Sequence, residues 1–92
     1  MIFEWDENKN ILNQSKHGID FNHIPNAFDS PMIIKRDERE NYGEDRLIGI
    51  GKIMNIIIVI VWTKRDDKIR IISARLANNK ERKIYYDKIN KN

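Results

Sequence analysis

The fold is decided by an unbroken apolar run, Ile-Ile-Ile-Val-Ile-Val-Trp, at residues 56–62. The run is far shorter than the roughly 20 residues that cross a bilayer, so it belongs to a core and not to a membrane. Because a strand points successive side chains to opposite faces, a run that is apolar at every position is apolar on both faces. We therefore predict a central strand, covered by helices on one side and by more chain or a partner on the other.

Further strand patterns flank this run on both sides. Short connections favour antiparallel neighbours, with hairpin turns at residues 64–67 and near residues 53–55. Alternation along the last strand predicts that Arg75 shares a face with Ser73, together with Ile69 and Ile71, and that Arg70, Ile72 and Ala74 take the other face. The predicted strands are residues 2–5, 32–35, 46–52, 55–63 and 68–76.

Two helices are predicted before residue 32. Asp6 is a good N-cap for a helix that runs to His17, and Gly18 is a left-handed C-cap. This helix has few apolar residues, mainly Ile11 and Leu12, so we expect it to pack along an edge of the sheet.

A second short helix follows, because Phe21, Ile24, Ala27 and Phe28 recur at helical spacing. We prefer Asn22 to Asp20 as its N-cap, since that choice places Pro25 in the first turn, where no amide donor is needed.

A third helix is predicted at the C-terminal end, where Asn78 and Glu81 form a capping-box pattern and the helix runs to about Ile89. The element order is then β-α-α-β-β-β-β-α, an α+β fold with a small antiparallel sheet flanked by helices. The length of 92 residues fits a single domain over residues 1–92.

Composition limits the classes of function. The chain has no cysteine, which excludes disulfides, a thiol nucleophile and thiolate zinc sites. Its N-terminus lacks the pattern of a secretory signal, so we expect a cytoplasmic protein with no membrane partner. Residues 1–63 carry 7 Lys/Arg against 10 Asp/Glu, whereas residues 64–92 carry 10 against 4. The basic last third suits a polyanion such as a nucleic acid, or is simply a solvated helix surface.

His17 is the first candidate for chemistry, because a helix C-terminus favours a protonated imidazole that can act as a general acid. The alternative is a histidine that only satisfies a helix carbonyl. Asp20 and His23 would complete a set of metal ligands, but Gly18 breaks the helical register among them. We therefore expect neither a metal site nor a cofactor.

A second group consists of arginines in or beside strand ends, where a rigid sheet can orient the guanidinium. Arginine suits phosphate, because its planar fork makes two parallel hydrogen bonds and stays charged. The alternative is cross-strand pairing with acidic residues such as Glu44 or Asp66, which contributes at most about 1 kcal/mol at a surface. We expect this simpler role for Arg70. The group is Arg46, Arg65, Arg70 and Arg75.

Several spaced motifs resemble one family. They are Phe3-Glu4-Trp5-Asp6, Lys9, Asn13, Lys16-His17-Gly18-Ile19, Phe21, Glu44-Asp45-Arg46, Arg70-Ile71-Ile72-Ser73-Ala74-Arg75, Ala77, Glu81-Arg82 and Tyr85. This pattern, from Ile2 to about Tyr86, resembles the BrnT family of bacterial toxins. The resemblance implies a RelE-like fold and a metal-independent ribonuclease that inhibits translation. By position it implies that His17, Arg46 and Arg75 are site residues, with Arg65 as a fourth.

The resemblance also implies partners. These are an RNA substrate, a BrnA-like ribbon-helix-helix antitoxin that neutralises the toxin, operator DNA bound through that antitoxin, and a toxin homodimer within the complex. A competing interpretation is a non-catalytic module that binds nucleic acid or antitoxin and acts as a corepressor. Cleavage of RNA in the presence of EDTA would distinguish the two.

Overall fold

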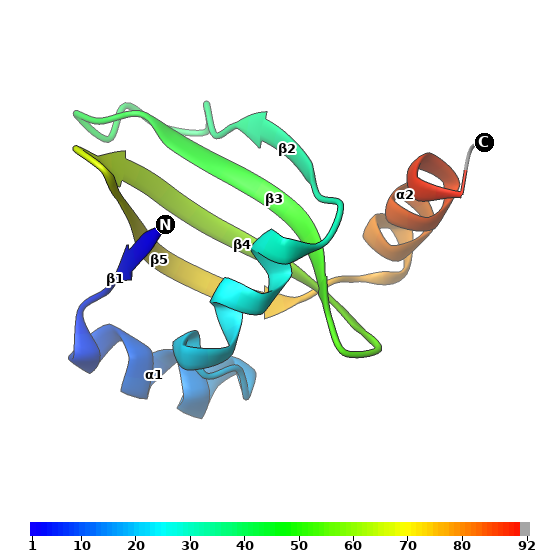
Figure 1. The fold of residues 1–92 in the computed structure, drawn as a ribbon, viewed down its shortest axis with the longest axis horizontal. Coiled ribbons are helices and arrows are strands. Elements are labelled where there is room, and N and C mark those ends of the chain that lie inside the picture. Colours follow the sequence, from blue (N-terminus) through cyan, green and yellow to red (C-terminus); the bar gives the residue numbers. More distant parts are fainter. Residues whose placement is uncertain (91–92) are drawn as a thin grey trace.

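A computed structural model describes residues 1–90 and contains one five-stranded mixed sheet, two α-helices and a 3₁₀-helix (Figure 1). The elements are β1 (Ile2–Glu4), α1 (Glu7–His17), η1 (Phe21–Asp29), β2 (Ile33–Arg36), β3 (Arg46–Ile53), β4 (Ile56–Arg65), β5 (Lys68–Leu76) and α2 (Asn79–Ile89). The strand order across the sheet is β1-β5-β4-β3-β2. The predicted element order is therefore observed, with the second helix of 3₁₀ type.

The apolar run lies in β4, the middle strand. Residues 57–62 are buried on both faces as predicted, whereas Ile56 is 50% exposed. One face of β4 contributes Ile58, Ile60 and Trp62 to the larger core beneath η1 and beside α1. The other face contributes Ile57 and Val59 to a smaller core, which α2 covers. We call the two sides of the sheet the α1 side and the α2 side.

The sheet is mixed, and the prediction of a purely antiparallel sheet is wrong. Strands β2 to β5 pair antiparallel through short connections, with Ile53 opposite Ile56 and Arg65 opposite Lys68 at the two hairpin turns. Strand β1 pairs parallel with β5. The rule that short connections give antiparallel neighbours cannot apply to β1, because no short connection joins these two strands.

A bulge in β5 corrects the predicted alternation. Val61 lies opposite Ser73, but the next residue of β4, Trp62, lies opposite Ile71, so Ile72 is the extra residue. Ile69, Ile71 and Ala74 consequently join the larger core. The other face takes Arg70, Ser73 and Arg75. Arg75 shares a face with Ser73, as predicted. Contrary to the prediction, Arg70 also lies on this face, the α2 side, whereas Ile69 and Ile71 lie on the α1 side.

Buried asparagines, and not apolar residues, attach α1 to the rest of the molecule. Ile11 and Leu12 are 57% and 68% exposed, whereas Asn10 and Asn13 are buried. The Asn10 side chain accepts a hydrogen bond from the Phe21 backbone amide, at 2.8 Å. The Asn13 side chain donates to the Ile19 carbonyl at 2.9 Å and accepts from the Ala74 amide at 3.2 Å, so it joins α1 to the edge of β5.

The start of η1 also differs from the prediction. Asp20 is the N-cap, because its carboxylate accepts a hydrogen bond from the Asn22 amide at 2.9 Å, and Pro25 lies inside the element. The Asp20 side chain also accepts from Asn10, which fixes it between α1 and η1. The caps of the other helices are as predicted: Asp6 and Gly18 for α1, and an Asn78–Glu81 capping box for α2.

Candidate phosphate-binding face

The strand register brings three arginines, from β3 and β5, to the α2 side of the sheet. Arg46 shares this face with Ile48 and Ile50, which pack in the smaller core beneath α2. Arg70 lies opposite Thr63, which lies opposite Arg46. Arg75 lies opposite Val59. The sheet therefore presents Arg46, Arg70 and Arg75 on one face.

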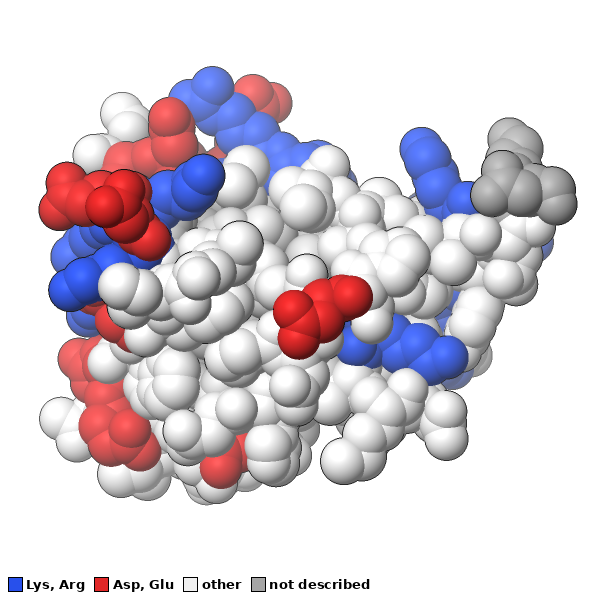
Figure 2. All heavy atoms as spheres, in the orientation of Figure 1, with Lys and Arg blue, Asp and Glu red and all other residues white. Residues whose placement is uncertain are grey.

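Arg46 and Arg65 meet at one end of this face through a shared carboxylate. The Glu44 side chain accepts from Arg46 Nε at 3.3 Å and from Arg65 Nη2 at 3.2 Å. Hydrogen bonding from Arg65, and then from Arg46, lowers the pKa of Glu44. The Arg46 guanidinium also lies 4.0 Å from the centre of the Tyr42 ring, a cation–π contact. This corner has charges of both signs, and Figure 2 shows acidic and basic side chains intermixed at that end of the molecule.

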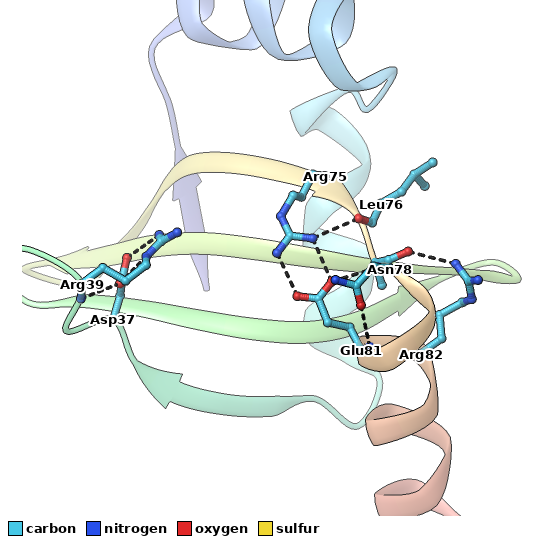
Figure 3. A network of polar contacts seen from close by, with 8 residues as sticks. Asp37, Arg39, Arg75, Leu76, Asn78, Glu81 and Arg82 are labelled. Atoms are coloured by element: carbon cyan, nitrogen blue, oxygen red, sulfur yellow. Dashed lines mark hydrogen bonds and ion pairs between the residues drawn. The ribbon is translucent and has the colours of Figure 1, made fainter.

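Arg75 lies towards the other end of β5 and binds α2. Its Nη1 and Nη2 atoms donate to the two carboxylate oxygens of Glu81, each at 2.8 Å, and Nη1 also donates to the Leu76 carbonyl at 3.2 Å (Figure 3). Hydrogen bonding to Glu81 raises the pKa of Arg75, and the same bonds lower the pKa of Glu81. The Arg75 side chain remains 42% exposed, so a ligand can reach it.

The four predicted site residues do not converge on one point. Ile50 of β3 lies opposite Val59 of β4, which in turn lies opposite Arg75 of β5. Arg46 is four residues before Ile50 on β3. Four strand residues and two strand spacings put the two arginine backbones roughly 16 Å apart. In the structure each guanidinium is held by a different carboxylate, Arg46 by Glu44 and Arg75 by Glu81. The structure therefore does not bring these two side chains together, and a common role at one phosphate stays a prediction.

His17 ends α1 and lies apart from the arginines. It is half-buried beside Gly18, whose amide donates to the Gln14 carbonyl at 2.9 Å. It borders a hollow of about 360 Å³ next to Ile53 and Leu76. Within residues 1–90, no hydrogen bond or ion pair joins His17 to any of the arginines.

Asp20 and His23 border the same hollow as His17. Over the part of the chain that the structure describes, however, no group of three or more His, Asp or Glu side chains is arranged to hold a metal ion.

Arg70 has the structural role that we expected, with a different partner. Its Nη1 atom donates to the Glu4 carboxylate at 2.6 Å, which ties β1 to β5. Glu44, which the sequence offers as a partner, binds Arg46 and Arg65 instead, and the neighbouring Asp45 binds Arg36.

Sequence reasoning missed Arg39, which lies in the connection between β2 and β3. Its side chain makes a two-pronged contact with the buried carboxylate of Asp37. An Asp-x-Arg pattern just after a predicted strand is the signal that would have found it, because a carboxylate two residues away can orient a guanidinium. The sequence does not reveal that this carboxylate is buried.

The large aromatic residues serve mainly as core. Phe28 lies edge-on to Phe3 and to Trp62, with ring centroids 5.1 and 5.0 Å apart, and Trp5 lies edge-on to Phe21. Among residues 1–90, no helix is long and apolar enough to cross a membrane.

An α+β fold that presents several guanidinium groups on one face of its sheet belongs to the class of small proteins suited to binding a phosphate backbone. The chain belongs to the BrnT family, whose model is described as the ribonuclease toxin, BrnT, of type II toxin-antitoxin systems and matches residues 5–81. No curated protein matches the chain. The family match is narrower than the resemblance seen in the sequence, but it includes His17, Arg46, Arg65 and Arg75. Membership implies a ribonuclease toxin with an antitoxin partner.

Proposed function

We propose that this chain is an endoribonuclease that cleaves RNA without a metal ion and so inhibits translation in the cytoplasm. The observation that carries the proposal is the register that places Arg46 and Arg75 on the same face of the sheet. On this face RNA would meet fixed cations beside a partly apolar surface, the combination that single-stranded nucleic acids require. The single sheet with its flanking helices supports the RelE-like fold that we propose for the chain.

Chemically, RNA supplies its own nucleophile. The 2′-hydroxyl attacks the adjacent phosphorus, the bond to the 5′-oxygen breaks, and the products are a 2′,3′-cyclic phosphate and a 5′-hydroxyl. A protein assists by stabilising the additional negative charge of the phosphorane and by moving two protons. We assign the charge stabilisation to Arg75, which is exposed and rigidly held by Glu81.

The other predicted site residues receive roles that fit their positions. Arg46 and Arg65 would bind phosphates further along the same RNA strand, because they lie at the far end of the face from Arg75. His17 would donate the proton to the leaving 5′-oxygen, which requires the scissile phosphate to lie within hydrogen-bonding distance of both His17 and Arg75, at the end of β5 near Leu76.

The test is incubation of the purified protein with labelled RNA in EDTA. We expect fragments that end in a 2′,3′-cyclic phosphate, and we expect Arg75→Gln to lower the cleavage rate by at least about a hundredfold, the loss typical of a charge-stabilising group. Binding of RNA without any cleavage by the wild-type protein would instead support the corepressor module. Cleavage only after addition of a divalent metal would overturn metal independence.

For the antitoxin we propose a BrnA-like ribbon-helix-helix protein that neutralises the toxin and links it to operator DNA, with two toxin copies in the complex. Membership in a type II toxin family supports a protein antitoxin. Co-expression with a short ribbon-helix-helix protein encoded beside this gene should restore growth and yield a complex that shifts operator DNA. Failure to copurify with such a protein would contradict the proposal.

A further inference from the structure

The loop after β2 holds an exposed arginine over the α2 side of the sheet. The Nε and Nη2 atoms of Arg39 donate to the two carboxylate oxygens of Asp37, each at 2.8 Å. The Arg39 side chain is 65% exposed, whereas that of Asp37 is only 1% exposed. A buried carboxylate thus fixes the direction of an exposed guanidinium.

Burying a carboxylate is costly unless its partner compensates for the lost hydration. The hydrogen bonds from Arg39 compensate for the lost hydration of the Asp37 carboxylate. They also lower the pKa of Asp37 to about 2. The Asp37 amide also donates to the Arg46 carbonyl at 2.8 Å, so the loop is tied to the first residue of β3. Arg39 is therefore tied to the sheet through Asp37.

Two arginines each bind a carboxylate through one of their two bidentate edges. A guanidinium has five N–H groups, which form an edge through Nε and one terminal nitrogen and an edge through both terminal nitrogens. Arg39 binds Asp37 through the first edge, and Arg75 binds Glu81 through the Nη1–Nη2 edge. Within residues 1–90, no carboxylate occupies the second edge of either guanidinium.

The two guanidinium groups extend over the same stretch of the sheet. Figure 3 shows Arg39 reaching in from the loop and Arg75 from β5, both in front of β4. The charge of Arg39 opposes the rise in the pKa of Arg75 that Glu81 causes, which means that the two cations repel each other. An anion between them would relieve this repulsion.

Two hollows lie on this side of the sheet. One of about 370 Å³ is bordered by Arg39 and Glu38, and a second of about 370 Å³ is bordered by Glu81. Both hollows are lined by Lys35 and Ile48, so they are neighbours. Ile48 and Ile50 provide an apolar floor, and Lys35 adds a cation.

We propose that Arg39 is a second phosphate-binding residue, which holds the same RNA phosphate as Arg75 while a neighbouring base lies on Ile48 and Ile50. This proposal rests on the proposed ribonuclease function and identifies the place on the α2 side where the RNA backbone binds. Asp37 acts as a positioning residue, because its carboxylate accepts both side-chain hydrogen bonds that orient Arg39.

The experiment measures binding of a fluorescent single-stranded RNA that is 2′-O-methylated throughout and therefore cannot be cleaved by its own 2′-hydroxyl. Arg39→Gln alone would leave Asp37 buried without its cation, so the main variant is Asp37→Asn with Arg39→Gln. We expect its affinity to fall roughly tenfold or more, as for loss of a hydrogen bond to a charged group. Arg39→Lys keeps the positive charge but loses the bidentate guanidinium, so its RNA affinity should lie between that of this variant and that of the wild type.

The matched control is Lys83→Gln with Asp87→Asn, which removes an exposed ion pair of α2 without changing net charge. Neither of these residues borders the two hollows, and the control should bind within twofold of wild type. Thermal unfolding verifies that both variants fold. If the variant at Asp37 and Arg39 binds RNA as tightly as this control while Arg75→Gln binds RNA weakly, the phosphate-binding role of Arg39 is refuted. That result would leave the proposed function intact. Absence of RNA binding by the wild type would refute the proposed function itself.

A double-mutant cycle tests whether both arginines hold one phosphate. Starting from the Asp37→Asn/Arg39→Gln background, Arg75→Gln should cost at least threefold less in affinity than it costs in wild type, because the shared phosphate is already released. Equal losses of RNA affinity in the two backgrounds would show that the two arginines bind different phosphates, and would overturn the proposal that they hold the same one.

Discussion

Glu81→Gln should strengthen RNA binding, an unusual direction for a substitution at a binding site. Glu81 occupies one edge of the Arg75 guanidinium with two hydrogen bonds of 2.8 Å. Glutamine keeps a side-chain oxygen for the capping box, in which Glu81 accepts from the Asn78 amide at 2.9 Å. The substitution therefore removes the negative charge while α2 retains its N-terminal cap.

The magnitude follows from Coulomb repulsion between a carboxylate and a phosphate bound to the same guanidinium. At a separation of about 4 Å this repulsion is about 1 kcal/mol in water and about 4 kcal/mol at the effective dielectric of a protein surface. Arg75 is 42% exposed, so we use the lower figure. A gain of about 1 kcal/mol corresponds to roughly fivefold tighter RNA binding.

The assay is fluorescence anisotropy with the 2′-O-methylated RNA at low and high salt. Asp87→Asn is the matched control, since it removes the same charge from an exposed ion pair with Lys83 on the same helix. We expect a gain for Glu81→Gln that is clearly larger than that of the control. An affinity equal to that of the control, or a weaker affinity than wild type in a folded protein, would show that RNA does not approach Arg75.

Three further predictions concern stability. Asn13→Ala removes two buried hydrogen bonds and should lower the free energy of unfolding by about 2 to 5 kcal/mol in a denaturant titration, whereas Asn8→Ala should cost less than about 1 kcal/mol. Asp37 has a folded-state pKa of about 2, below its usual 3.8, so its stabilisation is present above pH 4 and disappears as the pH falls towards 2. The free energy of unfolding should fall by about 1 to 2 kcal/mol between pH 4 and pH 2, a figure that allows for the exposure of Arg39. Denaturant titrations at these pH values should show no such fall for Asp37→Asn. Gly49→Ala would place a methyl group 2.7 to 2.8 Å from core side chains and should lower the thermal midpoint, at a cost of about 1 to 3 kcal/mol; an unchanged midpoint would show that the packing differs.

Local patterns in the sequence predicted the elements well where they were strong. The continuous apolar run identified the central strand, and Asp6 with Gly18 gave both ends of α1. The predictions failed where a distant contact decides the outcome. No local signal specifies that β1 pairs parallel with β5, or that Ile72 forms a bulge against β4.

The candidate site was predictable by residue type but not by arrangement. The sequence did not predict that Arg46 and Arg75 share a face, because both that face and their separation depend on the pairing of three strands. Arg39 gains its position from a carboxylate whose burial only the folded chain reveals. Asn13, part of the family resemblance, has a structural role as the residue that links α1 to β5.

Methyl NMR on isoleucine-labelled protein tests most directly whether RNA binds the α2 side of the sheet. On addition of the 2′-O-methylated RNA, the account predicts that the methyl signals of Ile48 and Ile50 shift and that those of Ile24 and Ile60 in the larger core do not. Shifts confined to Ile11 and other residues of the α1 side, with Ile48 and Ile50 unchanged, would contradict it.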